Sequence, residues 1–442
     1  MTNMEFKMKS TETFSYLSRN QKEAVGLLSI GTFLEFFDLM LYLHMAVLLN
    51  ELFFPKTDPH TAALLSAFTF CTTFVFQPIS ALILGWIGDN IGRKATVIIT
   101  TFIMAISCLI MANLPTYEQI GLAASWIMII CRICQGMSSM GEIVGAEVYL
   151  TEITKPPIQY PVVTVIAVFS ILGGTAALGI ASFVTSFGLN WRIAFWIGAG
   201  VAMIGAVART TLRETLDFAN AKFRIKNTFE KAEVSTELLS ASSIYKAKVN
   251  KQTIVALFLI QCGWPICFYF SYVHCGNILK NTFHYTADQV IHQNFLASMA
   301  NLIGYIIITY LSYKIHPLKI LKVKLGIFFV FILICPYLLY NIRTPFDLFL
   351  IQSFSMLFIL STNPAMSVLY THLPIFKRFT VATLIFAISR ALMSVITSFG
   401  LVYLIEYFGH WGLLIIMVPL CVGFAYGLHH FEKLEIEAGS YR

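Results

Sequence analysis

The sequence predicts an all-α membrane protein with twelve transmembrane helices in two six-helix bundles. Of its 442 residues, 57% are hydrophobic and only 12% are charged, whereas soluble domains carry about 25% charged residues. Stretches such as 325–339 are apolar on every face, which excludes a β-barrel because barrel strands alternate apolar and polar residues. The chain is long enough for twelve spans of roughly 20 to 25 residues, with loops and one longer connector between them.

The first bundle is expected over residues 23–212. The preceding residues 1–22 are polar and contain no apolar core of a signal peptide, so we expect a cytoplasmic N-terminal segment. Apolar windows between polar or Gly/Pro-marked breaks then predict six helices. They cover residues 23–49, 60–88, 94–114, 119–149, 160–187 and 191–212.

A polar connector separates this bundle from a second one over residues 251–431. Residues 213–250 hold seven Lys or Arg and five acidic residues without a sustained apolar run, which indicates a cytoplasmic linker. Six further helices are predicted, followed by a cytoplasmic tail over 432–442. They cover residues 252–279, 287–313, 319–340, 345–371, 378–405 and 409–431. Six plus six suggests an internal duplication, a common plan for secondary transporters.

Lys and Arg are distributed unevenly between the two sides of the predicted membrane. They gather in the N-terminal segment, the linker, the tail and the loops after spans 2, 4, 8 and 10, including four lysines between positions 314 and 324. The opposite side holds Lys56, Lys280 and Arg343, with Arg192 at a span edge. Both termini are therefore expected in the cytoplasm. Because the loops explain the net charge of +7, it does not indicate a nucleic-acid partner.

The loop between the second and third predicted helices carries the sharpest motif. Residues 85–94 read Gly-Trp-Ile-Gly-Asp-Asn-Ile-Gly-Arg-Lys. Glycines let helix ends approach closely, and Asp89 can pair with Arg93 four residues later; the plainer alternative is a solvated, positively charged turn. The string resembles the G-x-x-x-D-x-x-G-R-[RK] signature of the major facilitator superfamily. It places Gly85, Asp89, Gly92, Arg93 and Lys94 in a gating motif.

Further matches make the chain similar to the metabolite:proton symporter group of that superfamily, and most similar to its proline/betaine transporters. They concentrate in residues 21–220 and include Gly31-x-x-x-Glu35-Phe36-Phe37-Asp38, Gln135-Gly136, Gly141-Glu142 and Trp191-Arg192. The second half departs from the pattern, because Thr309 to Lys319 lacks the Asp and Gly-Arg of the signature.

This resemblance implies the major facilitator fold and proton-coupled uptake of a small metabolite by alternating access in a bacterial inner membrane. A zwitterion such as proline or betaine is the leading substrate class and a carboxylate the second. The implied partners are the substrate, protons and the lipid bilayer. A proton gradient is the expected energy source, without a bound cofactor or an obligatory protein partner.

Charged residues inside the predicted spans supply candidates that do not depend on the resemblance. Each central charge costs about 2.5 to 3.5 kcal/mol on insertion scales, so such residues should face the bundle interior. Helical geometry puts Glu35, Asp38 and Tyr42 within about 60° of one another, and Gln135 about 20° from Glu142. The candidates for proton coupling or substrate binding are Glu35, Asp38, Tyr42, Arg132, Gln135 and Glu142. The alternative is that these residues only make polar contacts between helices.

Four weaker candidates for the cavity remain. Glu147 and Arg390 are charged residues inside spans that look like additions to the family pattern, and Glu147 lies about 140° round its helix from Glu142. Trp264 and Tyr269 belong to an aromatic group in the seventh span that could hold an ammonium by cation–π contact.

Nothing in the sequence indicates an enzyme or a metal site. It has no phosphate-binding loop, no H-E-x-x-H zinc motif and no visible pair of nucleophile and base. The nine cysteines lie in apolar stretches and are expected to be reduced, and Cys131-x-x-Cys134 lacks further zinc ligands nearby. Glycine pairs such as Gly173-Gly174 predict close helix crossings. Two alternatives to an uptake symporter stay open: an exchanger or exporter of the same fold, and a transport-inactive membrane sensor.

Overall fold

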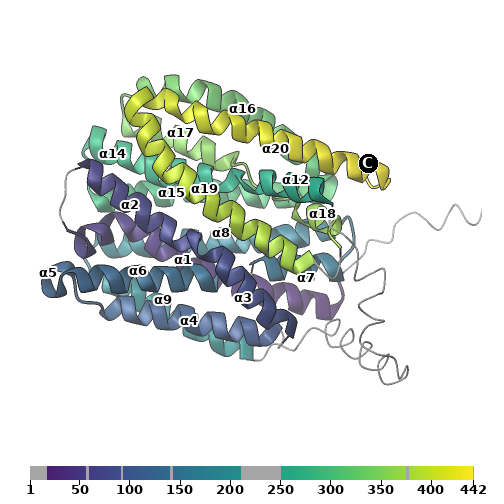
Figure 1. Ribbon diagram of the computed structural model, residues 1–442, viewed down its shortest axis with the longest axis horizontal. Helices are drawn as coiled ribbons and strands as arrows, with labels where there is room; N and C mark the ends of the chain where they lie inside the picture. The colour runs from purple at the N-terminus through teal and green to yellow at the C-terminus, as the bar shows by residue number, and fades with distance from the viewer. Residues whose placement is uncertain are drawn as a thin grey trace, which may run out of the picture.

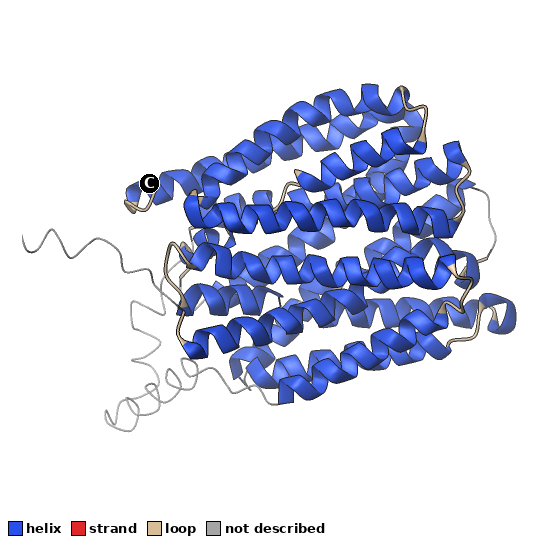
Figure 2. Cartoon of the chain, turned by 180° about the vertical axis from the view of Figure 1, so that it is seen from behind, coloured by secondary structure: helices blue, strands red, loops and turns tan. Residues whose placement is uncertain are grey.

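The computed structural model describes residues 17–55, 59–90, 93–139, 143–210, 250–374 and 378–441. Over these ranges the secondary structure is helical, without a strand (Figure 2). Most helices run side by side along the long axis of one bundle (Figure 1). The linker predicted over 213–250 lies outside the described residues except for Asn250.

The first half of the chain contains nine described helices. They are α1 (Arg19–Phe53), α2 (Pro59–Val75), α3 (Gln77–Asn90), α4 (Arg93–Asn113), α5 (Tyr117–Ile120), α6 (Leu122–Ser138), α7 (Ile143–Ile153), α8 (Gln159–Ser186) and α9 (Arg192–Thr210). Since α2 with α3 and α6 with α7 each form one interrupted pass, and α5 is a short connecting turn, these helices make six passes.

The second half repeats this number of passes. Its described elements are α12 (Lys251–Gln261), α13 (Gly263–Phe268), the π-helix η1 (Tyr269–His274), α14 (Cys275–Phe283), α15 (Ala287–Lys314), α16 (Pro317–Tyr340), α17 (Pro345–Leu357), α18 (Met366–Thr371), α19 (Arg378–Phe408), the 3₁₀ turn η3 (Gly409–Trp411) and α20 (Gly412–Glu437). The run α12 to α14 forms one pass, and α17 with α18 forms another. The prediction of twelve passes in two sets of six is confirmed.

The distribution of side chains is that of a membrane protein. On α6, Trp126 and Ile130 are 62% and 56% exposed, while Arg132 and Gln135 are fully buried. This reverses the pattern of a soluble amphipathic helix, whose apolar face is the buried one. By length and composition, six helical stretches of the described chain could each cross a bilayer, and four shorter apolar helices accompany them. The protein is therefore a multi-pass membrane protein.

Local sequence signals explain where several helices begin and end. Ser18 and Gln21 form a reciprocal capping box at the start of α1, which satisfies backbone N–H groups that have no partner within the helix. Pro317 opens α16 in its first turn, where the missing N–H of proline costs nothing. His284 ends α14 in the left-handed region with φ of 55°.

Glycines allow the close crossings that the sequence predicted. A Cβ atom at Gly173 of α8 would overlap the Phe33 carbonyl oxygen of α1, and one at Gly427 of α20 would lie 2.7 Å from the Ala256 carbonyl oxygen of α12. Only glycine lets backbones approach this closely. The two halves then meet mainly through α8 against α15 and α2 against α19.

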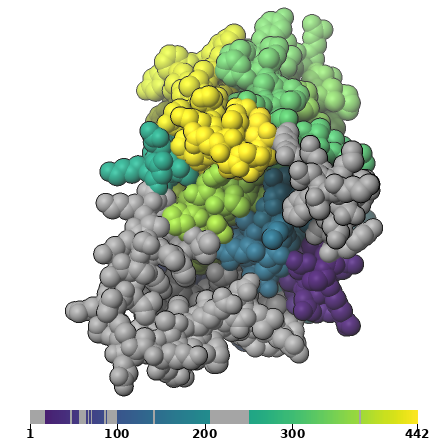
Figure 3. Space-filling model, turned by 90° about the vertical axis from the view of Figure 1, so that its right-hand side faces the viewer, coloured from purple at the N-terminus to yellow at the C-terminus, as the bar shows by residue number. Residues whose placement is uncertain are grey.

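Ion pairs join the halves at opposite ends of α1. Near its C-terminal end, Lys280 Nζ lies 3.0 Å from Glu51 Oε1. Near its N-terminal end, Arg378 Nη1 lies 3.4 Å from Glu152 Oε1, and Gln21 Nε2 donates to the Ile153 carbonyl at 2.6 Å. At this second end the start of α1 and the end of α20 both reach the surface (Figure 3). Ion pairs between the two halves therefore lie at both ends of the interface.

Candidate functional site

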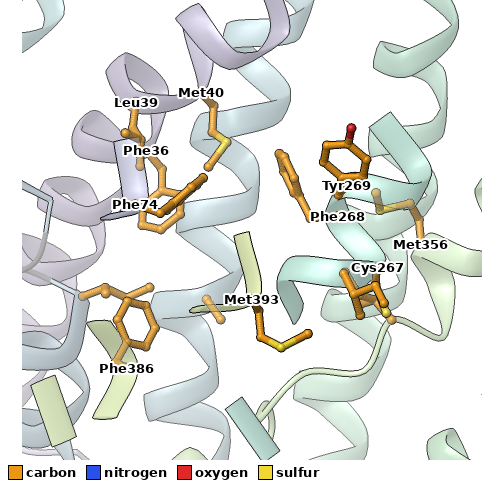
Figure 4. Close-up of a cluster of buried hydrophobic side chains, with 14 of the residues drawn as sticks. Phe36, Leu39, Met40, Phe74, Cys267, Phe268, Tyr269, Met356, Phe386 and Met393 are labelled. Carbon is orange, nitrogen blue, oxygen red and sulfur yellow. The ribbon is translucent and has the colours of Figure 1, made fainter. Parts of the chain in front are cut away.

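A cavity with a volume of about 90 Å³ lies between the two halves. The first half contributes α1, α7 and α8 to its wall, and the second half contributes α12, α13, η1, α15, α19 and the segment between α17 and α18. Figure 4 shows part of the apolar side, where Phe36 and Met40 face Phe268 and Met356 across the interface. Ligand sites at the interface of two repeats are typical of membrane carriers.

Irregular backbone from the second half borders this cavity. The helical pass of α17 and α18 is interrupted between Leu357 and Met366, and Ser361, Thr362 and Asn363 of the interruption line the wall. The π-helix η1 interrupts another pass, and Gln352 Nε2 donates to the carbonyl of its Ser271 at 2.7 Å. Non-helical backbone is tolerated at membrane depth where protein buries it or where it lines a cavity.

Arg390 of α19 is the basic residue on the cavity wall. Its guanidinium carbon lies 4.1 Å from the Trp264 ring centroid and 4.2 Å from that of Phe386. The residue is only 8% exposed. It makes no hydrogen bond or ion pair to any residue that the structure describes. A buried guanidinium stacked in this way is held in position while its N–H groups remain available for an anion.

Glu147 of α7 reaches the same cavity from the first half. It is 1% exposed, and Tyr370 of α18 donates its hydroxyl to Glu147 Oε2 at 3.2 Å. The two residues are 223 positions apart, so this hydrogen bond crosses the interface between the halves. A carboxyl group at this position can take up or release a proton. Its hydrogen bond to Tyr370 joins the two halves, so any movement of one half against the other would alter it.

Lys324 of α16 stands behind the cavity wall and was missed as a site residue. It is 5% exposed, and its amine lies 3.4 Å from Ser361 Oγ. The sequence analysis counted it among the loop charges after the eighth span, which was wrong because α16 begins at Pro317 and places Lys324 two turns inside the helix. The available signal was its position directly before the apolar run 325–339.

Glu35 and Asp38 lie inside the first half, away from the wall of the cavity between the halves. They line a second, smaller pocket between α1, α4, α6 and α9 inside the first half. On the same side of α1, Tyr42 lies under the Arg132 guanidinium, with 3.9 Å from the guanidinium carbon to the ring centroid. The expected polar face of α1 exists, but it faces the interior of its own bundle rather than the cavity between the bundles.

Arg132 is enclosed by its own half. Its Nη1 donates to Gln135 Oε1 at 2.9 Å, and its Nη2 donates to the Thr73 hydroxyl. Gln135 continues the network to Cys108 Sγ at 3.3 Å. The structure thus brings three predicted residues, Tyr42, Arg132 and Gln135, into one buried cluster that lies apart from the cavity wall.

The remaining predicted residues divide into three groups. Trp264 lines the cavity, whereas Tyr269 is buried beside it without forming part of the wall. Glu142 and Gly92 lie outside the described residues. Gly85 and Asp89 fall in α3, and Arg93 and Lys94 open α4, but their side chains are not described and the proposed gating contact stays a prediction.

The described residues contain no cluster of three or more His, Cys, Asp or Glu side chains able to hold a metal ion. The nine cysteines are all free, as the sequence analysis expected, and eight of them are buried. The groups that line the cavity are Arg390, Glu147, the His44 imidazole, neutral polar groups and aromatic rings.

Comparisons with known proteins agree with this architecture. The model of the Major Facilitator Superfamily matches residues 28–398. The chain is 26% identical over 274 residues to the proline/betaine transporter of Escherichia coli K12, covering 60% of this chain and 54% of that protein. It is 32% identical over 204 residues to a citrate-proton symporter of Salmonella typhi, covering 44% and 46%. The chain thus spans about half the length of these curated relatives.

Solved structures extend the likeness over nearly the whole chain. A proton:xylose symporter bound to a bromodeoxyglucose superposes with a TM-score of 0.71 at 16% identity, covering 94% of this chain and 96% of that one. At this identity the likeness concerns the fold alone.

Proposed function

The chain belongs to the Major Facilitator Superfamily, and from that premise we propose that it is a proton-coupled symporter for a small zwitterionic or carboxylate metabolite. One observation carries the proposal: the cavity between the two halves presents Glu147 from one half and Arg390 from the other. A carrier needs a site that both halves complete, because their relative movement then exposes it to one side at a time.

In this proposal Arg390 holds the carboxylate of the substrate. Trp264 and Phe386 fix the plane of its guanidinium, and a fixed planar fork matches the two oxygens of a carboxylate. Asn301, Gln261 and Ser361 also line the wall and offer neutral hydrogen-bonding groups that can orient the rest of a small molecule.

Glu147 carries the coupling proton. The ionised and protonated forms of its carboxyl group differ in how they accept the Tyr370 hydroxyl, so the proton changes the strength of a contact between the halves. A ligand shifts a conformational equilibrium only through different affinity for the two states, and this contact supplies such a difference. Protonation of Glu35, Asp38 or Glu142, and a latch between Asp89 and Arg93, are retained as additional proposals.

We further propose that the protein works in the uptake direction in a bacterial inner membrane, with both termini in the cytoplasm and a proton gradient as its energy source. The asymmetric distribution of Lys and Arg between loops supports this orientation. The proline/betaine transporter and the citrate-proton symporter among its relatives support the substrate class.

Transport by purified protein in liposomes tests the proposal. With an inside-alkaline pH gradient, the wild type should accumulate substrate, and Glu147→Gln should lose this accumulation while retaining exchange in preloaded vesicles without a gradient. Glu118→Gln, on the exposed helix α5, is the matched control and should behave as wild type. Normal gradient-driven accumulation by Glu147→Gln would remove that residue from coupling, and exchange without any accumulation by the wild type would identify an exchanger.

A further inference from the structure

The charges around the cavity are unbalanced. Arg390 lies on the wall, and the Lys324 amine stands behind it in contact with Ser361 Oγ. Against these two bases there is one acid on the wall, Glu147. Glu35 and Asp38 border the smaller pocket on a different face of α1, from which Glu35 still interacts electrostatically with Arg390. Among the described residues that line the cavity or contact a residue of its wall directly, two basic groups thus face one acidic group.

The aromatic rings of the wall offer little to an ammonium group. Trp264 and Phe386 already hold the Arg390 guanidinium, and a second cation beside it would be repelled. Phe268 packs against Tyr272 with ring centroids 4.8 Å apart, and Tyr272 in turn packs against His44 at 5.0 Å. The cation–π role that the sequence suggested for Trp264 is thus taken by a residue of the protein itself.

Anion-binding groups, in contrast, come from two directions. The Arg390 guanidinium is more than nine-tenths buried and has no hydrogen-bonding partner in the described chain, although burial of unsatisfied donors is costly. The interruption between α17 and α18 brings Ser361 to the wall directly in front of Lys324. The cavity therefore offers two positions that favour negatively charged oxygens, one at Arg390 and one at Ser361.

We propose that the cavity binds a small dicarboxylate rather than a zwitterion, with one carboxylate on Arg390 and the second at Ser361 in front of Lys324. This inference rests on the proposed transport function and narrows its substrate class. If Glu147 takes up the coupling proton as the substrate enters, two basic groups face two carboxylates, and the loaded site carries no net charge. A zwitterion would leave both positive charges uncompensated inside the membrane, which is unfavourable.

Three probes of equal carbon number separate the substrate classes: succinate with two carboxylates, butyrate with one, and 4-aminobutyrate with an ammonium in place of the second. Binding to the full-length protein in lipid nanodiscs is measured by calorimetry, and counterflow is measured in liposomes. We expect succinate to bind about tenfold or more tighter than butyrate, which corresponds to one additional charge-assisted contact. 4-Aminobutyrate should bind more weakly than either.

Variants on α16 assign the second carboxylate to its position. Lys324→Gln should weaken succinate binding about tenfold and change butyrate binding less than about threefold, because only the dicarboxylate places a negative charge at Ser361 in front of the amine. Lys324→Arg should keep the preference for succinate. Lys322→Gln, two residues away and paired with Glu432 at the surface, is the control and should bind both anions as wild type.

Each contrary result has a distinct meaning. Binding and counterflow of 4-aminobutyrate or glycine betaine without succinate would overturn the dicarboxylate inference and leave the transport proposal intact. Equal weakening of succinate and butyrate by Lys324→Gln, with the protein still folded by size exclusion, would show that Lys324 only supports the wall. Absence of binding and of counterflow for all four compounds would count against both proposals.

Discussion

Two buried arginines of this protein have opposite relations to their surroundings. Arg132 is fully buried, donates to Gln135 and Thr73, and lies on the Tyr42 ring. Arg390 is nearly as buried and also lies on aromatic rings, yet it donates to no described residue and borders the central cavity. Both terminal nitrogens of Arg132 are thus bonded within its own bundle, although its Nε has no partner among the described residues, whereas Arg390 lacks a partner that a ligand can supply.

The difference shows why a buried charge alone does not identify a site. Both residues carry the desolvation cost of a charge in the membrane, and both are oriented by aromatic stacking. What separates them is whether protein groups already accept from the guanidinium. We therefore propose a binding role for Arg390 and a structural role for Arg132.

The largest effect is expected from Arg390→Gln. Loss of a charge-assisted, bidentate contact to a carboxylate should lower counterflow on the order of 100-fold, or about 3 kcal/mol. Thermal unfolding in detergent should change little, because no described residue loses a hydrogen bond. Retained transport with reduced stability would reverse the comparison and make Arg390 the structural residue.

Gly173→Ala should disturb both regions together. Helix α1 carries Tyr42 towards Arg132 and Met40 towards the cavity, and Gly173 is where α8 meets its backbone. The added methyl group would overlap the Phe33 carbonyl, with a destabilisation of about 3 kcal/mol. The control is Gly200→Ala on α9, where nothing lies within 4 Å of an added Cβ. Equal thermal stability of the two variants would contradict this packing.

Arg132→Met should destabilise the first half without changing substrate recognition. The Thr73 and Gln135 side chains lose a charged donor in a buried place, which costs about 2 kcal/mol. Thermal unfolding should report that loss, while the KM for transport should stay within about threefold of wild type. A large rise in KM would show that Arg132 contributes to substrate binding, for which the sequence made it a candidate.

The smallest effect compares two tyrosines. Tyr370→Phe removes the donor to Glu147 and should cost about 1 kcal/mol, seen as a shifted pH dependence of uptake. Tyr42→Phe removes a hydroxyl that has no hydrogen-bond partner among the described residues, so stability should change by less than about 0.5 kcal/mol. Identical pH profiles for Tyr370→Phe and wild type would show that the hydrogen bond from Tyr370 does not affect the protonation of Glu147 during transport.

The helices themselves were largely predictable, because a span needs only a long apolar run with polar or glycine-marked ends. Interruptions within spans were not. Residues 60–88 and 345–371 were each predicted as one helix, but breaks occur after Val75 and after Leu357. Pro78 follows the first break closely and Pro364 lies in the second, and each removes a backbone donor. Whether a proline interrupts a span also depends on how neighbouring helices satisfy the freed backbone groups, which the local sequence does not show.

The site was predicted only in part, for a similar reason. Periodicity correctly gave α1 one polar face, since Tyr42 does meet Arg132. It could not tell whether that face meets another helix of the same bundle or the opposite bundle. Glu147 and Arg390 were ranked below Glu35 and Asp38, although the hydrogen bond from Tyr370 to Glu147 joins residues 223 positions apart. Contacts at such separation follow from tertiary packing alone.

The two ion pairs that close the interface differ in their access to water, and this makes them respond differently to dissolved electrolyte. Lys280 and Glu51 have side chains that are 34% and 60% exposed, whereas Arg378 and Glu152 are 9% and 26% exposed. Screening acts more strongly on the wetter pair. Rising ionic strength should therefore weaken the Lys280–Glu51 pair more than the Arg378–Glu152 pair, so that added salt loosens one end of the interface before the other.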